Sequence, residues 1–152
     1  MIEHANHQDR RIVVGVDSSP GSKTALRWAL NQARTSGAAV EAVTAWQDPT
    51  VYDGWVPTPV DGDAIATSAE SALANTVVEV RENRDQPVDV RITVVEGPAV
   101  QVLLAAAKGA ELLVVGSRGR GAFTGMVLGS VSQHCVQHSP CAVAVIPDIE
   151  PA

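Results

Sequence analysis

The feature that most constrains the fold of this chain is an alternation of two patterns along its length. Short runs of branched aliphatic residues, typical of buried β-strands, alternate with longer segments whose apolar residues recur every three or four positions, as in helices with one apolar face. The predicted strands cover residues 11–16, 39–46, 88–95, 111–115 and 141–146. The predicted helices begin at Ser19-Pro20, near Asp63, at Gly97-Pro98 and near Gly129; Gly37 and Gly109 stop the first and the third, and the others end near Asn83 and His138. This order predicts an α/β fold with a parallel sheet and helices on both of its faces.

Five strands in this order predict a Rossmann-like or flavodoxin-like sheet with the strand order 3-2-1-4-5. The length of 152 residues suits one domain. We expect that domain to span residues 11–147, with flexible tails over residues 1–10 and 148–152. The inward face of the second predicted helix includes Ala69, Ala72, Leu73, Thr76 and Val80.

The composition argues against several kinds of partner. A formal net charge of −6 disfavours an extended nucleic-acid surface, which usually needs a basic excess. Because no run approaches the roughly 18 apolar residues of a membrane span, we expect no membrane partner either. The N-terminus is polar and lacks the apolar core of a signal peptide, so we expect a cytoplasmic location. The two cysteines, Cys135 and Cys141, are expected to be small buried residues rather than a disulfide framework.

A glycine-rich segment follows the fourth predicted strand, at the carboxyl edge of the sheet where ligands of open α/β folds bind. Residues 116–130 hold five glycines, which let a backbone turn tightly and bring its N–H groups close to an anion. The segment then enters a helix at Gly129-Ser130, and a helix N-terminus favours phosphate. Arg118 and Arg120 add positive charge, and Ser130 and Ser132 can add hydroxyl donors. These features predict phosphate binding; the alternative is a loop whose glycines merely permit tight turns.

Three parts of the chain, in the right order, resemble the universal stress protein family. The spacing Gly116-x2-Gly119-x9-Gly129-Ser130 is similar to the ATP-binding signature of that family. Residues 11–17 resemble its first strand, and residues 129–132 and 139–147 resemble its last helix and strand. The resemblance covers about residues 11–147 and implies a Rossmann-like nucleotide-binding domain.

The resemblance also implies a set of nucleotide contacts. Asp17 would lie near the ribose or a bound Mg²⁺, and the backbone of Ala45 would read the adenine edge. Val115 and Gly116 would end the fourth strand beside the nucleotide. The phosphates would be held by Gly119, Gly129 and Ser130, with Arg118, Arg120, Val131 and Ser132 lining the cradle. Where the family often has a His-containing stretch at the end of the second strand, this chain has Thr44.

The function that the resemblance implies is that of an ATP-binding sensor or regulator in a stress response, with Mg²⁺ as a possible companion of the nucleotide. One alternative is a binder of AMP or cyclic AMP, and another is a ligand-free dimeric interaction protein. Because no catalytic base is evident, we name no catalytic residue and expect at most a slow ATPase. Ser130 is not expected to be a nucleophile, since no His–Asp pair accompanies it.

Single residues leave further alternatives open. His134 and His138 are four apart on a helix, so they either bind a metal ion or simply face solvent. Asp17 either contacts the ligand or caps the first helix. In the long loop over residues 47–62, Tyr52 and Trp55 either cover the adenine or pack within the loop.

The last predicted strand, residues 141–146, is apolar and uncharged, and the predicted strand order places it at an edge of the sheet. An unpaired edge strand invites pairing with another chain, so we expect a homodimer in which two copies of this strand pair. The resemblance implies the same. The alternative is a monomer whose edge is covered by the N-terminal tail.

Overall fold

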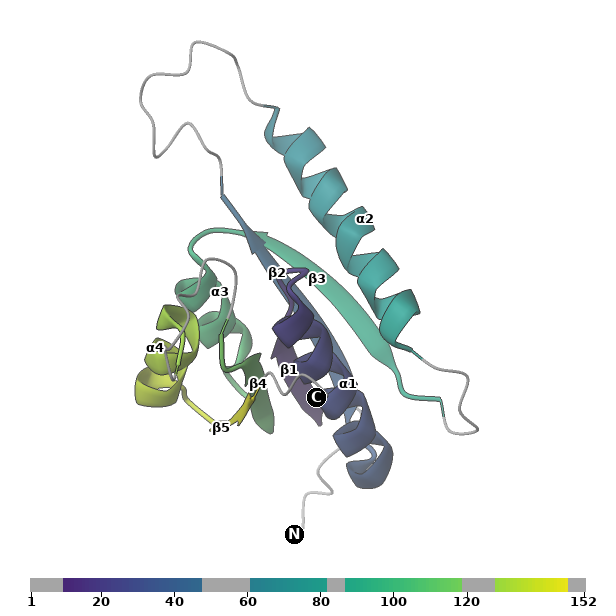
Figure 1. The fold of residues 1–152 in the computed structure, drawn as a ribbon, viewed down its shortest axis with the longest axis vertical. Helices are drawn as coiled ribbons and strands as arrows, with labels where there is room; N and C mark the ends of the chain where they lie inside the picture. Colours follow the sequence, from purple (N-terminus) through teal and green to yellow (C-terminus); the bar gives the residue numbers. More distant parts are fainter. Residues whose placement is uncertain (1–9, 48–60, 82–86, 119–127, 148–152) are drawn as a thin grey trace, which may run out of the picture.

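The computed structural model of the chain describes residues 10–47, 61–81, 87–118 and 128–147 (Figure 1). Its strands are β1 (Arg11–Gly15), β2 (Ala39–Trp46), β3 (Val90–Glu96), β4 (Leu112–Gly116) and β5 (Ala142–Ile146). Its helices are α1 (Pro20–Ser36), α2 (Gly62–Val80), α3 (Ala99–Ala106) and α4 (Ser130–His138). All neighbouring strands pair in parallel, in the order β3-β2-β1-β4-β5. The predicted fold class and strand order are therefore confirmed.

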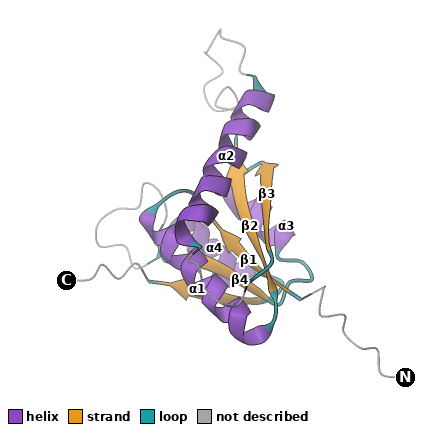
Figure 2. Cartoon of the chain, turned by 90° about the vertical axis from the view of Figure 1, so that its right-hand side faces the viewer, coloured by secondary structure: helices purple, strands orange, loops and turns teal. Residues whose placement is uncertain are grey.

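The helices form two layers around the sheet (Figures 1 and 2). Side chains from α1 and α2 pack on one face around Ile12, Val14 and Val40. Side chains from α3 and α4 pack on the other face around Val13 and Leu113. Because both faces of the central strands are covered, β1 and β4 contain continuous buried runs instead of an alternation of apolar and polar residues.

Local signals explain where α1 begins and ends. The Oγ of Ser19 accepts a hydrogen bond from the N–H of Ser22, and Pro20 occupies the first helical position, where its missing N–H costs nothing. At the other end Gly37 adopts a left-handed φ of 78°, and its N–H donates to the carbonyl of Ala33. The predicted start and stop of this helix are confirmed.

Other predicted boundaries are displaced by a few residues. β3 begins at Val90 instead of residue 88, because Val88 and Asp89 precede the parallel pairing with β2. α2 ends at Val80, three residues before the predicted end, since Arg81 is extended and its N–H donates to the carbonyl of Val77. α3 ends at Ala106, three residues before Gly109, the glycine predicted to stop it. The remaining boundaries differ from prediction by one residue or none.

α2 is buried along only part of its length. Its buried residues are Leu73, Thr76, Val77 and Val80, all in the C-terminal half. Ala69 is half-buried and Ala72 is exposed, so of the predicted inward face only Leu73, Thr76 and Val80 are buried. Figure 2 shows the reason: the N-terminal half of α2 extends past the ends of the strands that its C-terminal half covers.

Polar contacts hold the amino edge of the sheet together. Arg10 pairs with Glu111 at 3.0 Å and also donates to the carbonyl of Ser36. The hydrogen bond to Glu111 and its negative charge raise the pKa of Arg10. Arg11 donates to the carbonyls of Ala106 and Lys108.

Of the two predicted tails, residues 1–9 and 148–152 lie outside the described residues.

The two cysteines differ in burial, and neither forms a disulfide within the described structure. Cys135 is fully buried in α4, and burial raises the pKa of its thiol. Cys141 is only half-buried, because it precedes an edge strand. The expectation of burial is therefore wrong for Cys141.

Among the described helices, none is both long enough and apolar enough to cross a bilayer.

Candidate functional site

A pocket of about 850 Å³ opens at the carboxyl ends of β1, β2 and β4. The first turns of α1, α3 and α4 form part of its wall, and the N-terminal half of α2 forms another part. All the predicted site residues that the structure describes line it: Asp17, Ala45, Val115, Gly116, Arg118, Gly129, Ser130, Val131 and Ser132. Gly119 and Arg120 lie outside the described residues. The fold thus brings together residues more than a hundred positions apart in the sequence.

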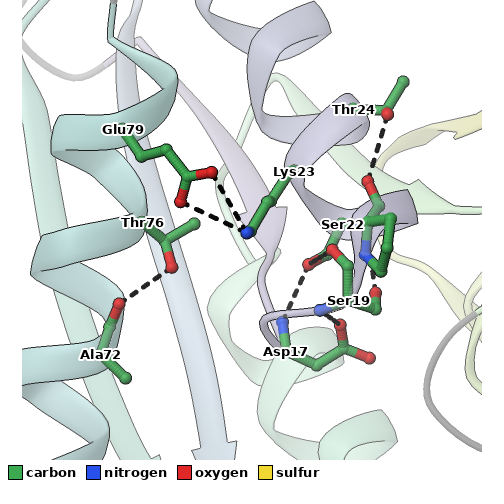
Figure 3. A network of polar contacts seen from close by, with 9 residues as sticks. Asp17, Ser19, Ser22, Lys23, Thr24, Ala72, Thr76 and Glu79 are labelled. Atoms are coloured by element: carbon green, nitrogen blue, oxygen red, sulfur yellow. Dashed lines mark hydrogen bonds and ion pairs between the residues drawn. The ribbon is translucent and has the colours of Figure 1, made fainter.

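The turn from β1 to α1 positions Asp17 (Figure 3). One carboxylate oxygen of Asp17 accepts the N–H of Ser19 at 2.9 Å, and the N–H of Asp17 donates to the Oγ of Ser22 at 3.2 Å. Between them, Ser18 adopts a left-handed φ of 68°, which is uncommon for a residue other than glycine. Ser19 is the residue that caps α1, so the alternative in which Asp17 is the cap is wrong.

The end of β4 lies close to the start of α1. A Cβ on Gly116 would come within 3.1 Å of the carbonyl oxygen of Gly21, too near for a larger side chain without a shift of backbone. The N–H of Ser117 donates to the carbonyl of Ile146 and so extends the pairing of β4 with β5. Gly116 therefore lets the strand reach the pocket beside the first turn of α1.

The two ends of the glycine-rich segment are joined by hydrogen bonds. The N–H of Gly129 donates to the carbonyl of Ser117 at 2.6 Å. The Oγ of Ser132 lies 2.9 Å from that same carbonyl oxygen and 3.0 Å from the carbonyl oxygen of Gly129. Ser132 is only 2% exposed, and its single hydroxyl hydrogen is directed to these carbonyls. It therefore holds the segment in place and is not set up to donate to a ligand.

The N-terminus of α4 differs from those of α1 and α2. Ser19 caps α1 and Asp61 caps α2, each through a side-chain oxygen. Among the described residues no side chain caps α4, whose N-cap is Gly129. Its first N–H groups and its helix dipole therefore meet the pocket, where Ser130 and Arg118 also lie. This end of the pocket suits an anion.

The other end of the pocket is mostly apolar. Trp46 at the end of β2 and Ile65, Ala69 and Leu73 of α2 contribute to its lining. Ala45 lines it as well, but packs with Leu103 of α3 on the opposite face of the sheet. The Oγ1 of Thr44 donates to the carbonyl of Val16 at 2.8 Å, so this residue joins the ends of β2 and β1. Behind the pocket, Lys23 and Glu79 form an ion pair between α1 and α2 at 3.3 Å (Figure 3).

The wall that α2 contributes was not predicted as part of the site. Ala69, Ala72 and Leu73 were predicted on the inward face of this helix, but not as residues that line a cavity. The sequence carries no signal that separates these positions from a packed core, since Ala25 and Ala29 of α1 are equally small and fully buried. Ser18 and Ser19, directly after Asp17, and Ser22, in the first turn of α1, were also missed as residues of the site.

The remaining candidates are the two histidines considered as metal ligands and the two aromatic residues considered as a lid. His134 and His138 are exposed on α4, as the solvent-facing alternative expected. Within the described residues, no group of three or more His, Cys, Asp or Glu side chains is arranged to hold a metal ion. Tyr52 and Trp55 lie outside the described residues, so the prediction of a lid stays untested.

The fold and the pocket define a Rossmann-like α/β protein with a ligand-sized cavity beyond the carboxyl ends of its strands. The sequence model of the Universal stress protein family matches residues 9–147, so the chain belongs to the universal stress protein family. The predicted family is confirmed.

Curated relatives support the same assignment. Universal stress protein Rv2005c of Mycobacterium tuberculosis is 40% identical over 126 residues, which are 82% of this chain and 41% of the relative. A universal stress protein of Mycolicibacterium smegmatis is 34% identical over 149 residues, 95% of this chain and 48% of the relative. The chain thus spans less than half the length of these relatives.

Solved structures share the fold. The match to Universal stress protein UspA from Lactobacillus plantarum covers 93% of this chain and 99% of that protein. Its TM-score is 0.72 and the sequence identity is 24%. A universal stress protein solved in complex with cAMP has a TM-score of 0.60 and 26% identity, and the match covers 92% of this chain and 98% of that protein. The universal stress protein from Archaeoglobus fulgidus, solved in complex with dAMP, has a TM-score of 0.59 and 21% identity. That match covers 90% of this chain and 97% of that protein.

Proposed function

We propose that this chain binds an adenine nucleotide in the pocket at the carboxyl edge of its sheet, that ATP is its ligand, and that it acts as a nucleotide-responsive regulator in a stress response. The observation that carries the proposal is the N-terminus of α4, which has only Gly129 as its N-cap and faces a pocket that also contains Arg118 and Ser130. Phosphate groups are among the anions that such helix ends bind.

The shape and polarity of the pocket support this proposal. A volume of about 850 Å³ lies within the range of small-molecule sites. Its apolar lining, with Ala45 at the end of β2 and Ile65, Ala69 and Leu73 of α2, suits a purine base. Its other end, at α4, suits phosphate. The relative that was solved with cAMP adds support for an adenine nucleotide.

ATP is favoured over AMP and cyclic AMP because the chain keeps the whole spacing from Gly116 through Gly119 to Gly129 and Ser130. Gly119 lies outside the described residues, so its place in this spacing comes from the sequence alone. Asp17 lines the pocket and is our proposed neighbour of a Mg²⁺ ion bound with the nucleotide, since carboxylate oxygens are ligands that Mg²⁺ prefers. The ion would offset the charge of the phosphates.

We propose a binding protein and assign no catalytic residue, so we expect any hydrolysis of ATP to be slow. We also propose that residues 11–147 form the single domain responsible for binding. The cytoplasmic location stays a prediction based on the sequence.

A homodimer through β5 belongs to the same proposal. β5 lies at an edge of the sheet, and its residues Val143 to Ile146 are only half-buried in the isolated chain. Pairing with the β5 of a second copy would satisfy the backbone groups of that edge. The alternative cover, the N-terminal tail, lies outside the described residues.

The proposal is tested by thermal unfolding of the purified chain with ATP, AMP or cyclic AMP, each with and without Mg²⁺. A ligand that binds only the folded state stabilises it by about 2.7 kcal/mol at 100 times its dissociation constant. We expect ATP with Mg²⁺ to give the largest shift at equal concentration. A larger shift with AMP or cyclic AMP would instead favour that ligand, and no shift with any of them at millimolar concentration would favour a ligand-free interaction protein.

A further inference from the structure

His134 and His138 form a pair on the outer surface of α4, apart from the proposed nucleotide pocket. Residues four apart lie one above the other on a helix, and here both side chains are exposed. Their ring centroids are 6.3 Å apart and their planes differ by 28°. Neither residue lines the pocket.

The hydrogen bond of His134 determines which of its ring nitrogens carries the proton. Its Nδ1 lies 2.7 Å from the carbonyl oxygen of Ser130. Because a carbonyl oxygen can only accept, Nδ1 must be the donor, and in the neutral ring Nε2 then has a free lone pair. Metal-binding histidines characteristically make this kind of bond, with one nitrogen held by a backbone carbonyl and the other bound to the ion.

The position of the pair on the helix also favours a cation. His138 is the last residue of α4, where the helix dipole is negative. Because this ring is exposed at a helix end, turning it toward His134 displaces no packed side chain. The zinc site we propose needs such a turn, because zinc–nitrogen bonds are about 2.0–2.1 Å long and the ring centroids are 6.3 Å apart.

We propose that His134 and His138 bind one divalent transition-metal ion of the kind that prefers imidazole, such as Zn²⁺, Ni²⁺ or Cu²⁺. Among the described residues no third His, Cys, Asp or Glu side chain joins the pair, so water completes the coordination. The site shares only the backbone of Ser130 with the nucleotide pocket, and the proposal does not rest on nucleotide binding.

The test is a calorimetric titration of the full chain with Zn²⁺, without nucleotide, since ATP itself chelates the ion. We expect one Zn²⁺ site. His134→Gln or His138→Gln should weaken its Zn²⁺ affinity about 10²-fold, because each removes one of the two protein ligands. The matched controls are His4→Gln/His7→Gln, which removes the two other histidines of the chain, and Cys141→Ser. Both controls should bind Zn²⁺ like the parent.

A rescue experiment tests the geometry. In the His138→Gln background, Gln137→His places a ring three residues from His134 and should restore much of the affinity. Val136→His places a ring only two residues away, on another face of the helix, and should not. Undiminished binding in His134→Gln, loss of binding in either control, or equal rescue by the two added histidines would each overturn the proposal.

Discussion

At the scale of single residues, Ser130 and Ser132 show how two similar side chains acquire different roles. Both were predicted to line a phosphate cradle, and both line the pocket. Ser132 is buried and its hydroxyl joins Ser117 to Gly129, whereas Ser130 is exposed at the start of α4, next to the N-cap Gly129. The sequence could not separate them, because the burial of each depends on how α4 packs against the sheet.

This difference predicts opposite effects of two matched substitutions. Ser132→Ala should lower the free energy of unfolding by about 1 kcal/mol, the typical net value of one hydrogen bond. Ser130→Ala should leave stability nearly unchanged and weaken ATP binding several-fold. Urea unfolding and ATP titration of both variants provide the measurement. If Ser130→Ala were the less stable variant and bound ATP like the parent, the two roles would have to be exchanged.

At the scale of elements, helix periodicity identified the face of α2 but not what that face contacts. The stripe of small and apolar residues continues through the helix, yet only the part from Leu73 to Val80 packs on the sheet. The part before it faces the pocket through Ile65 and Ala69. A periodic pattern reports which residues point inward, and only the tertiary structure shows whether a core or a cavity lies there.

The proposed function makes a prediction for α2. A nucleotide in the pocket would fill the space beside residues 62–72, so their amide hydrogen exchange should slow when ATP is added. Residues 74–80 of the same helix do not line the pocket and should change much less, which makes them an internal control. Hydrogen exchange followed by mass spectrometry checks this. Equal slowing along the whole helix would mean that ATP stabilises the fold without contacting α2.

At the scale of the whole molecule, the sequence was sufficient to predict the parallel sheet and its strand order. The branched aliphatic runs at β1 and β4 are buried on both faces, which requires helices above and below the sheet. The same order places β3 and β5 at the edges. The parts that could not be predicted include the α2 wall, which depends on contacts between elements distant in the chain. They also include the Asp17 turn, because a left-handed φ at Ser18 is uncommon for a residue other than glycine.

The proposed dimer predicts different results for the two edges. Val145→Lys, on β5, should yield a folded monomer or insoluble protein, because a charge would enter the proposed interface. Val95→Lys, on the exposed edge strand β3, should leave the dimer intact and is the matched control. Light scattering measures the mass and circular dichroism reports the fold. A parent chain that is monomeric at micromolar concentration would contradict the proposed dimer.

The central claim is that ATP binds in the pocket with its phosphates at the start of α4. Its most direct test is a titration of the ¹⁵N-labelled chain with ATP and Mg²⁺, followed through backbone amide resonances. We predict saturable shifts at Gly116, Ser130 and Val131, because their N–H groups would meet phosphate, and at Ala45, beside the base. Saturating ATP that leaves these four resonances unmoved, or that moves only amides remote from the pocket such as those of β3, would contradict the claim.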